Sequence, residues 1–199
     1  MNEKVNEETK KKNPYTIWFV VLTFVAPVVL AYVMFFFGNV TSFTNKGEIL
    51  NPIVDISALK LKDEKGALIP VKTLTYKWRL LSFVGSDCDE ACISRLYDAR
   101  QIHKSLAKDQ HRVLRMIVHL GQPSAELNML IKSEYPNAIN VFGNENAISA
   151  ALGETSKIKE NEIYIMDPMG NIMMRFTQDQ PNKDFQKDLG KLLKASQIG

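Results

Sequence analysis

The chain has 199 residues, with 25 lysines and arginines, 22 acidic residues and a formal net charge of +3. This length accommodates one domain and its attachments. The mild positive charge is spread along the chain, so we expect no nucleic-acid partner. The only two cysteines cannot form a disulfide framework, so the fold must depend on ordinary burial of apolar side chains.

The first part of the chain is a polar tail followed by an uncharged apolar segment. We predict a cytoplasmic tail over residues 1–15 and a single transmembrane helix over residues 16–38. The uncharged run of about 22 residues would measure about 33 Å as a helix, which is enough to cross a bilayer. A cleaved signal peptide has a shorter apolar core and a small-residue cleavage site, so we interpret this segment as a permanent anchor.

The basic residues around the anchor predict its orientation. Lys10, Lys11 and Lys12 precede the anchor and only Lys46 follows it closely, so the positive-inside rule places the N-terminus in the cytoplasm. In a bacterium, the anchor would lie in the inner membrane and the rest of the chain in the periplasm, where thiols can be oxidised. We expect a periplasmic tether over residues 39–53.

We predict one folded domain over residues 54–199, beginning with a β-hairpin. Residues 56–62 alternate apolar and polar side chains, which indicates a strand. Residues 63–66 have the composition of a turn, and residues 67–71 are predicted to return as a second short strand.

The two cysteines lie between a predicted buried strand, Trp78 to Val84, and a predicted helix, Ile93 to Leu106. Cys88 and Cys92 are four residues apart, so on a helix they share one face, with about 6 Å between their Cα atoms. The free N–H groups and positive dipole end of a helix start favour the thiolate, which binds metals and attacks disulfides. Three adjacent acidic residues oppose this effect. The alternative interpretation is a cysteine pair without a chemical role.

The remaining elements complete an alternating α/β order. Helices between strands imply parallel strand pairs, and a final hairpin adds antiparallel ones. A βαβ unit with cysteines at its first helix, closed by a hairpin and a helix, is the thioredoxin arrangement. We therefore predict an α/β, thioredoxin-like fold with an N-terminal β-hairpin extension, preceded by one transmembrane helix. The predicted strands are residues 112–120, 139–142, 163–166 and 172–176, and the predicted helices are residues 125–135, 145–152 and 184–195.

With these features, the chain resembles the Sco/SenC branch of the thioredoxin superfamily. The resemblance rests on the anchor, the Cys88-x-x-x-Cys92 spacing and the hairpin of residues 164–170. It implies a membrane-anchored protein that helps to build the copper centre of cytochrome c oxidase. The chain is more similar still to a divergent group of bacterial oxidase-associated transmembrane proteins. The motifs that carry this narrower resemblance are residues 45–52, 77–81, 96–97, 100–101 and 188–193.

The chain departs from the Sco pattern in its ligands. Sco proteins bind copper with two cysteines and a distal histidine, whose equivalent position here lies near Lys159, and residues 157–161 contain no histidine. The proline after the second Sco cysteine and the cis-proline of thioredoxins are also absent. His119 and Met169 are weak candidates for a third copper ligand, because thioether and imidazole both bind copper. Ordinary structural roles are the alternative for both residues.

Three functions remain open. The first is an accessory factor in cytochrome c oxidase assembly that binds Cu(I) transiently through Cys88 and Cys92, with an oxidase subunit or assembly factor as partner. The second is a thiol-disulfide reductant, an enzyme in which Cys88 attacks and Cys92 resolves the mixed disulfide. The third is a structural partner in an assembly complex, in which the two cysteines form only a local disulfide.

Overall fold

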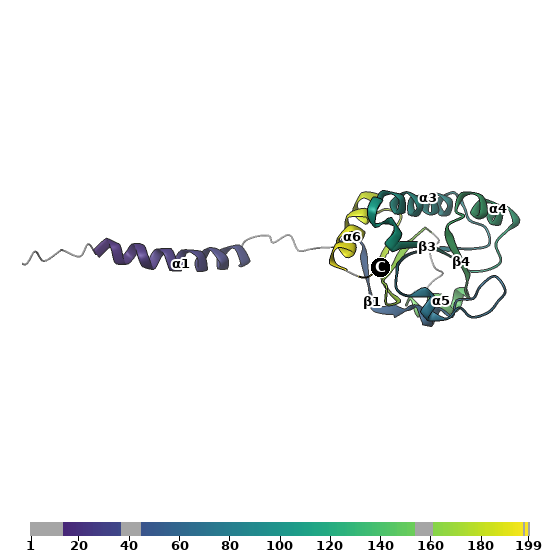
Figure 1. Ribbon diagram of the computed structural model, residues 1–199, viewed down its shortest axis with the longest axis horizontal. Helices are drawn as coiled ribbons and strands as arrows, with labels where there is room; N and C mark the ends of the chain where they lie inside the picture. The colour runs from purple at the N-terminus through teal and green to yellow at the C-terminus, as the bar shows by residue number, and fades with distance from the viewer. Residues whose placement is uncertain (1–13, 37–44, 154–160, 197, 199) are drawn as a thin grey trace, which may run out of the picture. The chain divides into compact units, whose positions relative to one another are not determined.

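The computed structural model describes residues 14–36, 45–153, 161–196 and 198. The chain divides into two compact units, Met1–Thr44 and Asn45–Gly199. We describe each unit by itself (Figure 1). The predicted cytoplasmic tail up to residue 13, and residues 39–44 of the predicted tether, lie outside the described residues.

The described residues of the first unit form the helix α1 (Pro14–Phe36), with Pro27 in its interior. Its segment Ile17–Phe36 has a mean hydropathy of 2.5 over its most apolar window, none of which is buried inside the protein. By length and composition this helix can cross a membrane. The predicted helix is therefore confirmed as far as Phe36.

The second unit is built on a six-stranded mixed sheet with the strand order β1-β6-β5-β2-β3-β4. The three strands β2, β3 and β4 run parallel, whereas β5, β6 and β1 pair in antiparallel fashion from β2 outward. The thioredoxin-like order predicted from the sequence is confirmed. The strands are β1 (Glu48–Asp55), β2 (Trp78–Val84), β3 (Val113–His119), β4 (Ala138–Phe142), β5 (Ile163–Met166) and β6 (Asn171–Phe176).

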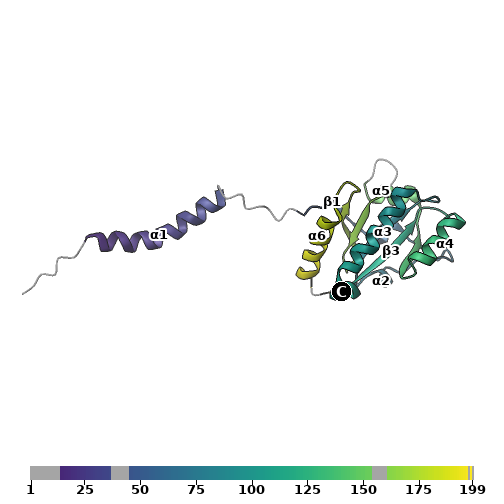
Figure 2. The ribbon, with the colours of Figure 1, turned by 90° about the horizontal axis from the view of Figure 1, so that it is seen from above.

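Helices cover both faces of the sheet (Figure 1). Figure 2 shows α6, α3 and α4 side by side on one face, while α5 lies on the other. Every residue of β2 is buried, because the strand lies inside the sheet and is covered from both sides. The α-helices are α2 (Val71–Leu74), α3 (Glu90–Ser105), α4 (Ala125–Glu134), α5 (Glu145–Ala151) and α6 (Asn182–Ala195), and the 3-10 helices are Ile56–Leu59 and Ala107–Arg112.

The start of the domain differs from the prediction. Residues 48–55, expected in the tether, form the edge strand β1. The expected strand over residues 56–62 begins instead as a 3-10 helix, because Asp55 caps the Ser57 N–H and the apolar residues at either end of the helix turn inward. The predicted N-terminal hairpin is reduced to one antiparallel bridge, Lys62 with Leu68.

A buried carboxylate fixes the beginning of the second unit. Asp188 of α6 is fully buried and accepts hydrogen bonds from the backbone N–H groups of Lys46 and Gly47. The Lys191 ammonium donates to the same carboxylate at 3.0 Å. Burial alone would raise the pKa of Asp188, but the hydrogen bonds from Lys191, Gly47 and Lys46 outweigh it and hold the pKa below its usual value.

Candidate functional site

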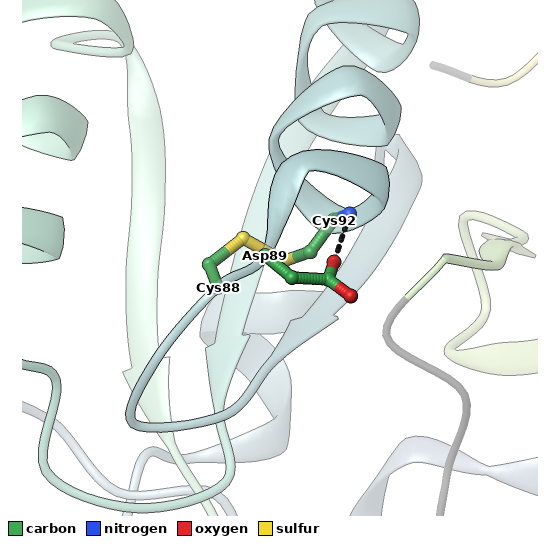
Figure 3. The surroundings of a disulfide bond; sticks show 3 residues. All are labelled: Cys88, Asp89 and Cys92. Atoms are coloured by element: carbon green, nitrogen blue, oxygen red, sulfur yellow. Dashed lines mark hydrogen bonds between the residues drawn. A yellow bond between two sulfur atoms is a disulfide. The ribbon is translucent and has the colours of Figure 1, made fainter.

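Cys88 and Cys92 form a disulfide with 5.3 Å between their Cα atoms. Figure 3 shows Cys88 in the loop before α3 and Cys92 in the first turn of that helix. The strand-to-helix junction predicted for the pair is confirmed, and the Cα separation is close to the helical spacing expected.

Asp89 determines where the cysteine helix begins. Its carboxylate accepts a hydrogen bond from the Cys92 backbone N–H at 2.8 Å, so Asp89 is the N-cap and α3 begins at Glu90, before the predicted start at Ile93 (Figure 3). The cap places Cys92 within the first turn, where the positive end of the helix dipole stabilises a thiolate.

The two sulfur atoms differ in access. Cys92 is 1% exposed, whereas Cys88 is only partly buried. Cys88 also lines a cavity of about 350 Å³ between the start of α3 and α4, and Cys92 does not. An incoming thiolate would therefore meet Cys88 first and leave Cys92 as the departing sulfur.

Arg95 is a site residue that sequence reasoning missed. It lies one turn after Cys92 and is only 3% exposed. One guanidinium nitrogen lies 3.2 Å from the Asn182 side-chain oxygen, and the other donates to the carbonyls of Phe176 at 3.1 Å and Thr177 at 2.9 Å. Burial lowers the pKa of Arg95. Arg95 therefore fastens the cysteine helix to the segment between β6 and α6.

His119 does not meet the cysteines. It ends β3, is 2% exposed, places Nε2 3.2 Å from Asn140 Oδ1 and stacks on the Phe142 ring with centroids 4.8 Å apart. Burial lowers its pKa. It lines a cavity of about 490 Å³ that includes neither cysteine. His119 is held by its strand neighbours, as in the structural role that the sequence left open.

Met169 lies at the opposite end of the sheet from the cysteines. In the antiparallel pairing of β2 with β5, Arg79 faces Met166, so the turn after Met166 lies beside the beginning of β2. The Tyr76 N–H, just before β2, donates to the Pro168 carbonyl at 2.6 Å. The length of β2 therefore separates Met169 from the cysteines, about 25 Å at the rise of a strand. In the described structure, Met169 therefore does not lie beside the cysteine pair.

No third metal ligand joins the cysteine pair within the part of the chain that the structure describes. Over these residues, no group of three or more His, Cys, Asp and Glu side chains is placed to hold a metal ion. The position near Lys159, which by resemblance corresponds to the Sco histidine, lies outside the described residues. The described site is thus a disulfide-bonded cysteine pair at a helix start.

Solved structures of Sco proteins share this fold. Arabidopsis thaliana ScoI with copper bound matches with a TM-score of 0.54 and 14% identity, covering 68% of this chain and 96% of that one. Yeast Sco1 matches with a TM-score of 0.54 and 15% identity, covering 72% and 97%. A SCO1/SenC family lipoprotein from Bacillus anthracis matches with a TM-score of 0.54 and 15% identity, covering 73% and 97%. At these identities the likeness establishes the fold.

A family model places the chain more narrowly. Residues 78–196 match the model described as the transmembrane-like, thioredoxin-like, C-terminal domain, and no curated protein matches the sequence. The matched segment runs from the first residue of β2 to the end of α6, and so contains both cysteines and five of the six strands. The chain therefore belongs to the transmembrane-like, thioredoxin-like family, and its domain has the fold of the Sco/SenC proteins.

Proposed function

We propose that this protein is a membrane-anchored accessory factor in cytochrome c oxidase assembly that binds Cu(I) transiently through reduced Cys88 and Cys92. The observation that carries the proposal is the cysteine pair at the start of α3, on a fold that Sco proteins share. Matching structures of Arabidopsis ScoI and of yeast Sco1 have copper bound, and another match, BsSco, is a member of the Sco family of cytochrome c oxidase assembly proteins.

The chemistry of the pair suits copper as a cargo. Reduction of the disulfide gives two thiolates, which are soft ligands that prefer Cu(I). The helix start stabilises their negative charge. His119 is held by Asn140 and Phe142, and Met169 lies at the other end of the sheet. An open two-thiolate site exposes the metal to an acceptor, which suits transfer better than storage.

The proposed location follows from α1. We place this helix across the bacterial inner membrane with the N-terminus in the cytoplasm, because three lysines precede it and one follows closely. The domain would then lie in the periplasm, where the pair can be oxidised. An oxidase subunit or another assembly factor is the partner that this placement favours.

A second candidate is thiol-disulfide exchange on a partner that must receive metal. The observation that favours it is the disulfide itself, with Cys88 beside a cavity and Cys92 buried. In the reduced protein, the Cys88 thiolate would attack the partner's disulfide and form a mixed disulfide. The Cys92 thiolate would then attack Cys88 and release the partner as a dithiol, which restores the disulfide observed here.

Competition for Cu(I) tests the first proposal. The full chain in nonionic detergent is reduced, and its Cu(I) affinity is measured against the chromogenic chelator bicinchoninic acid. We expect one Cu(I) per chain, lost in Cys88→Ser and in Cys92→Ser and kept in the control Met169→Ala. Binding no tighter than in the serine variants would refute copper transfer. The reduction potential of the Cys88–Cys92 pair would then distinguish a thiol-disulfide exchange function from a purely structural disulfide.

A further inference from the structure

The cavity beside Cys88 combines an apolar lining with an acidic rim. Ile93 from α3 and Leu127 and Leu130 from α4 form its apolar part, and its volume is about 350 Å³. This volume is large enough for one apolar side chain of a binding partner. The cavity therefore offers a pocket next to the accessible sulfur of the disulfide.

Two carboxylates line this pocket, and two more follow Cys88 in the chain. Asp87 and Glu126 line it, and Asp89 and Glu90 lie immediately after Cys88 in the chain. All four residues are exposed, and none forms an ion pair with a described basic residue. The rim therefore carries negative charge that no described basic side chain neutralises, next to the accessible sulfur of Cys88.

Helix capping explains only part of this rim. Asp89 caps α3, and Glu90 and Glu126 occupy the first turns of α3 and α4, where negative charge is favourable. Asp87 lies in the loop before α3 and makes no described hydrogen bond. Its carboxylate has no described protein partner and faces solvent, so it is open to a cationic group of a ligand.

The apolar surface continues beyond the pocket along the same helix. Ile93 and Tyr97 are one turn apart on α3 and are 38% and 48% exposed. A pocket, an adjoining apolar ridge and a like-charged rim around one accessible sulfur form a surface for a peptide segment rather than for a small ion.

We propose that the surface formed by Asp87, Ile93, Tyr97, Glu126 and Leu130 docks a cysteine-bearing segment of a partner protein. That segment carries lysine or arginine close to its cysteine and an apolar side chain that enters the pocket. The proposal rests on the proposed function, in that the docked cysteine reacts with the Cys88–Cys92 pair. Charge complementarity selects the cationic segment and accelerates its encounter with the sulfur.

The reaction at this surface balances as ordinary disulfide exchange. A partner thiolate attacks Cys88 Sγ, a new sulfur–sulfur bond forms, and the electron pair of the old bond leaves on Cys92 Sγ. A second partner thiolate then attacks the partner's sulfur in the mixed disulfide and releases Cys88 as a thiolate. The partner is oxidised by two electrons and the pair is reduced by two. The reverse sequence describes the reduced protein acting on a partner disulfide.

Two short peptides test the charge preference. The probes are acetyl-Lys-Leu-Cys-Leu-Lys-amide and acetyl-Glu-Leu-Cys-Leu-Glu-amide, used to reduce the disulfide of the full chain in nonionic detergent at low salt. Rate constants are expressed per thiolate, and the readout is the ratio of the cationic to the anionic peptide. We expect a ratio of about tenfold, which falls toward one in 1 M salt because screening removes the attraction.

Variants test whether the carboxylates of the rim cause the difference in rate between the two peptides. The double change Asp87→Asn with Glu126→Gln should lower the ratio roughly threefold or more, because it removes two charges that line the pocket. Glu64→Gln, which removes an exposed carboxylate elsewhere, should leave the ratio unchanged. Comparing ratios between proteins cancels the intrinsic reactivity of the two peptides. A third peptide with alanine in place of leucine should react about threefold more slowly, since it cannot fill the pocket.

The outcomes separate this proposal from the one on which it rests. Equal ratios in the wild type and the double variant at low salt would overturn the docking surface, while Cu(I) binding by the reduced pair would still stand. A disulfide that no peptide reduces would overturn the docking surface and the thiol-exchange function, while Cu(I) binding by the chemically reduced pair would still stand. A ratio that follows the rim charges in a protein without Cu(I) affinity would support docking for thiol exchange alone.

Discussion

Replacing Arg95 with methionine tests whether the cysteine helix is held in place by one buried cation. Arg95→Met keeps most of the aliphatic volume but removes the donors to the Phe176 and Thr177 carbonyls and to Asn182. The ion pair with Asp98, at 3.3 Å, is lost as well. Removing one member of a buried charged network costs about 3–5 kcal/mol. For a domain of this size that corresponds to a fall in Tm of roughly 10 °C.

Urea and thermal unfolding, followed by circular dichroism with the disulfide intact, measure this loss of stability. Lys104→Met removes a positive charge from the exposed side of the same helix and should change the free energy of unfolding by less than about 0.5 kcal/mol. Arg95→Lys should recover only part of the loss, because an ammonium cannot reach two carbonyls and an amide together. An Arg95→Met protein as stable as the Lys104→Met control would refute the reasoning.

Three further changes have defined outcomes. Burial lowers the pKa of His119, so the free energy of unfolding of the wild type should fall as the pH drops below the unfolded-state pKa of about 6.5. In His119→Gln, the free energy of unfolding should depend less on pH between pH 7 and 5. The stability advantage of wild type over Asp188→Asn should be complete at pH 7 and shrink below about pH 4, because the native pKa of Asp188 is lowered. Gly47→Ala should cost about 1–3 kcal/mol by unfolding, because its Cβ would overlap the Phe176 ring.

The central strands and the helices could be predicted because each carries a strong local pattern. The strand Trp78 to Val84 agrees with the structure at both ends, since it is a continuous apolar run between polar segments. The final helix has its apolar residues at helical spacing, and Phe185 and Leu189 are buried as predicted. In these segments, local propensity and tertiary burial favour the same structure.

The first strand of the domain could not be predicted by the same means. Residues 48–55 include Asn51 and Pro52, which are unfavourable in a strand, and only Leu50 and Val54 are buried. Proline is tolerated here because β1 lies at the edge of the sheet, where fewer ladder hydrogen bonds are needed. The strand exists because β6 offers a partner from far along the chain, and a local pattern carries no information about that pairing.

At the candidate site, the role of Arg95 could not be predicted from a local sequence pattern either. Its position on α3 looks like part of a charged face, but it is buried because main-chain carbonyls more than 80 residues away accept its hydrogen bonds. A charged residue in a helix is almost never fully buried without such partners. Sequence reasoning could have found Arg95 only by knowing that the end of β6 lies beside the cysteine helix.

The direction of β5 determines which residues lie close enough to the cysteines to share a metal ion with them. Sulfur chemistry made Met169 a weak candidate for a Cu(I) ligand. Because β5 runs antiparallel to β2, however, Ile163 at the beginning of β5 pairs with Ser82 near the cysteine end. Each later residue of β5 lies farther away, and the turn that carries Met169 is the farthest. For the proposed copper site, a further ligand would therefore come from a loop at the cysteine end of the sheet or from the acceptor. A copper ion held by two thiolates can take its remaining ligands from the acceptor, and such a site favours transfer.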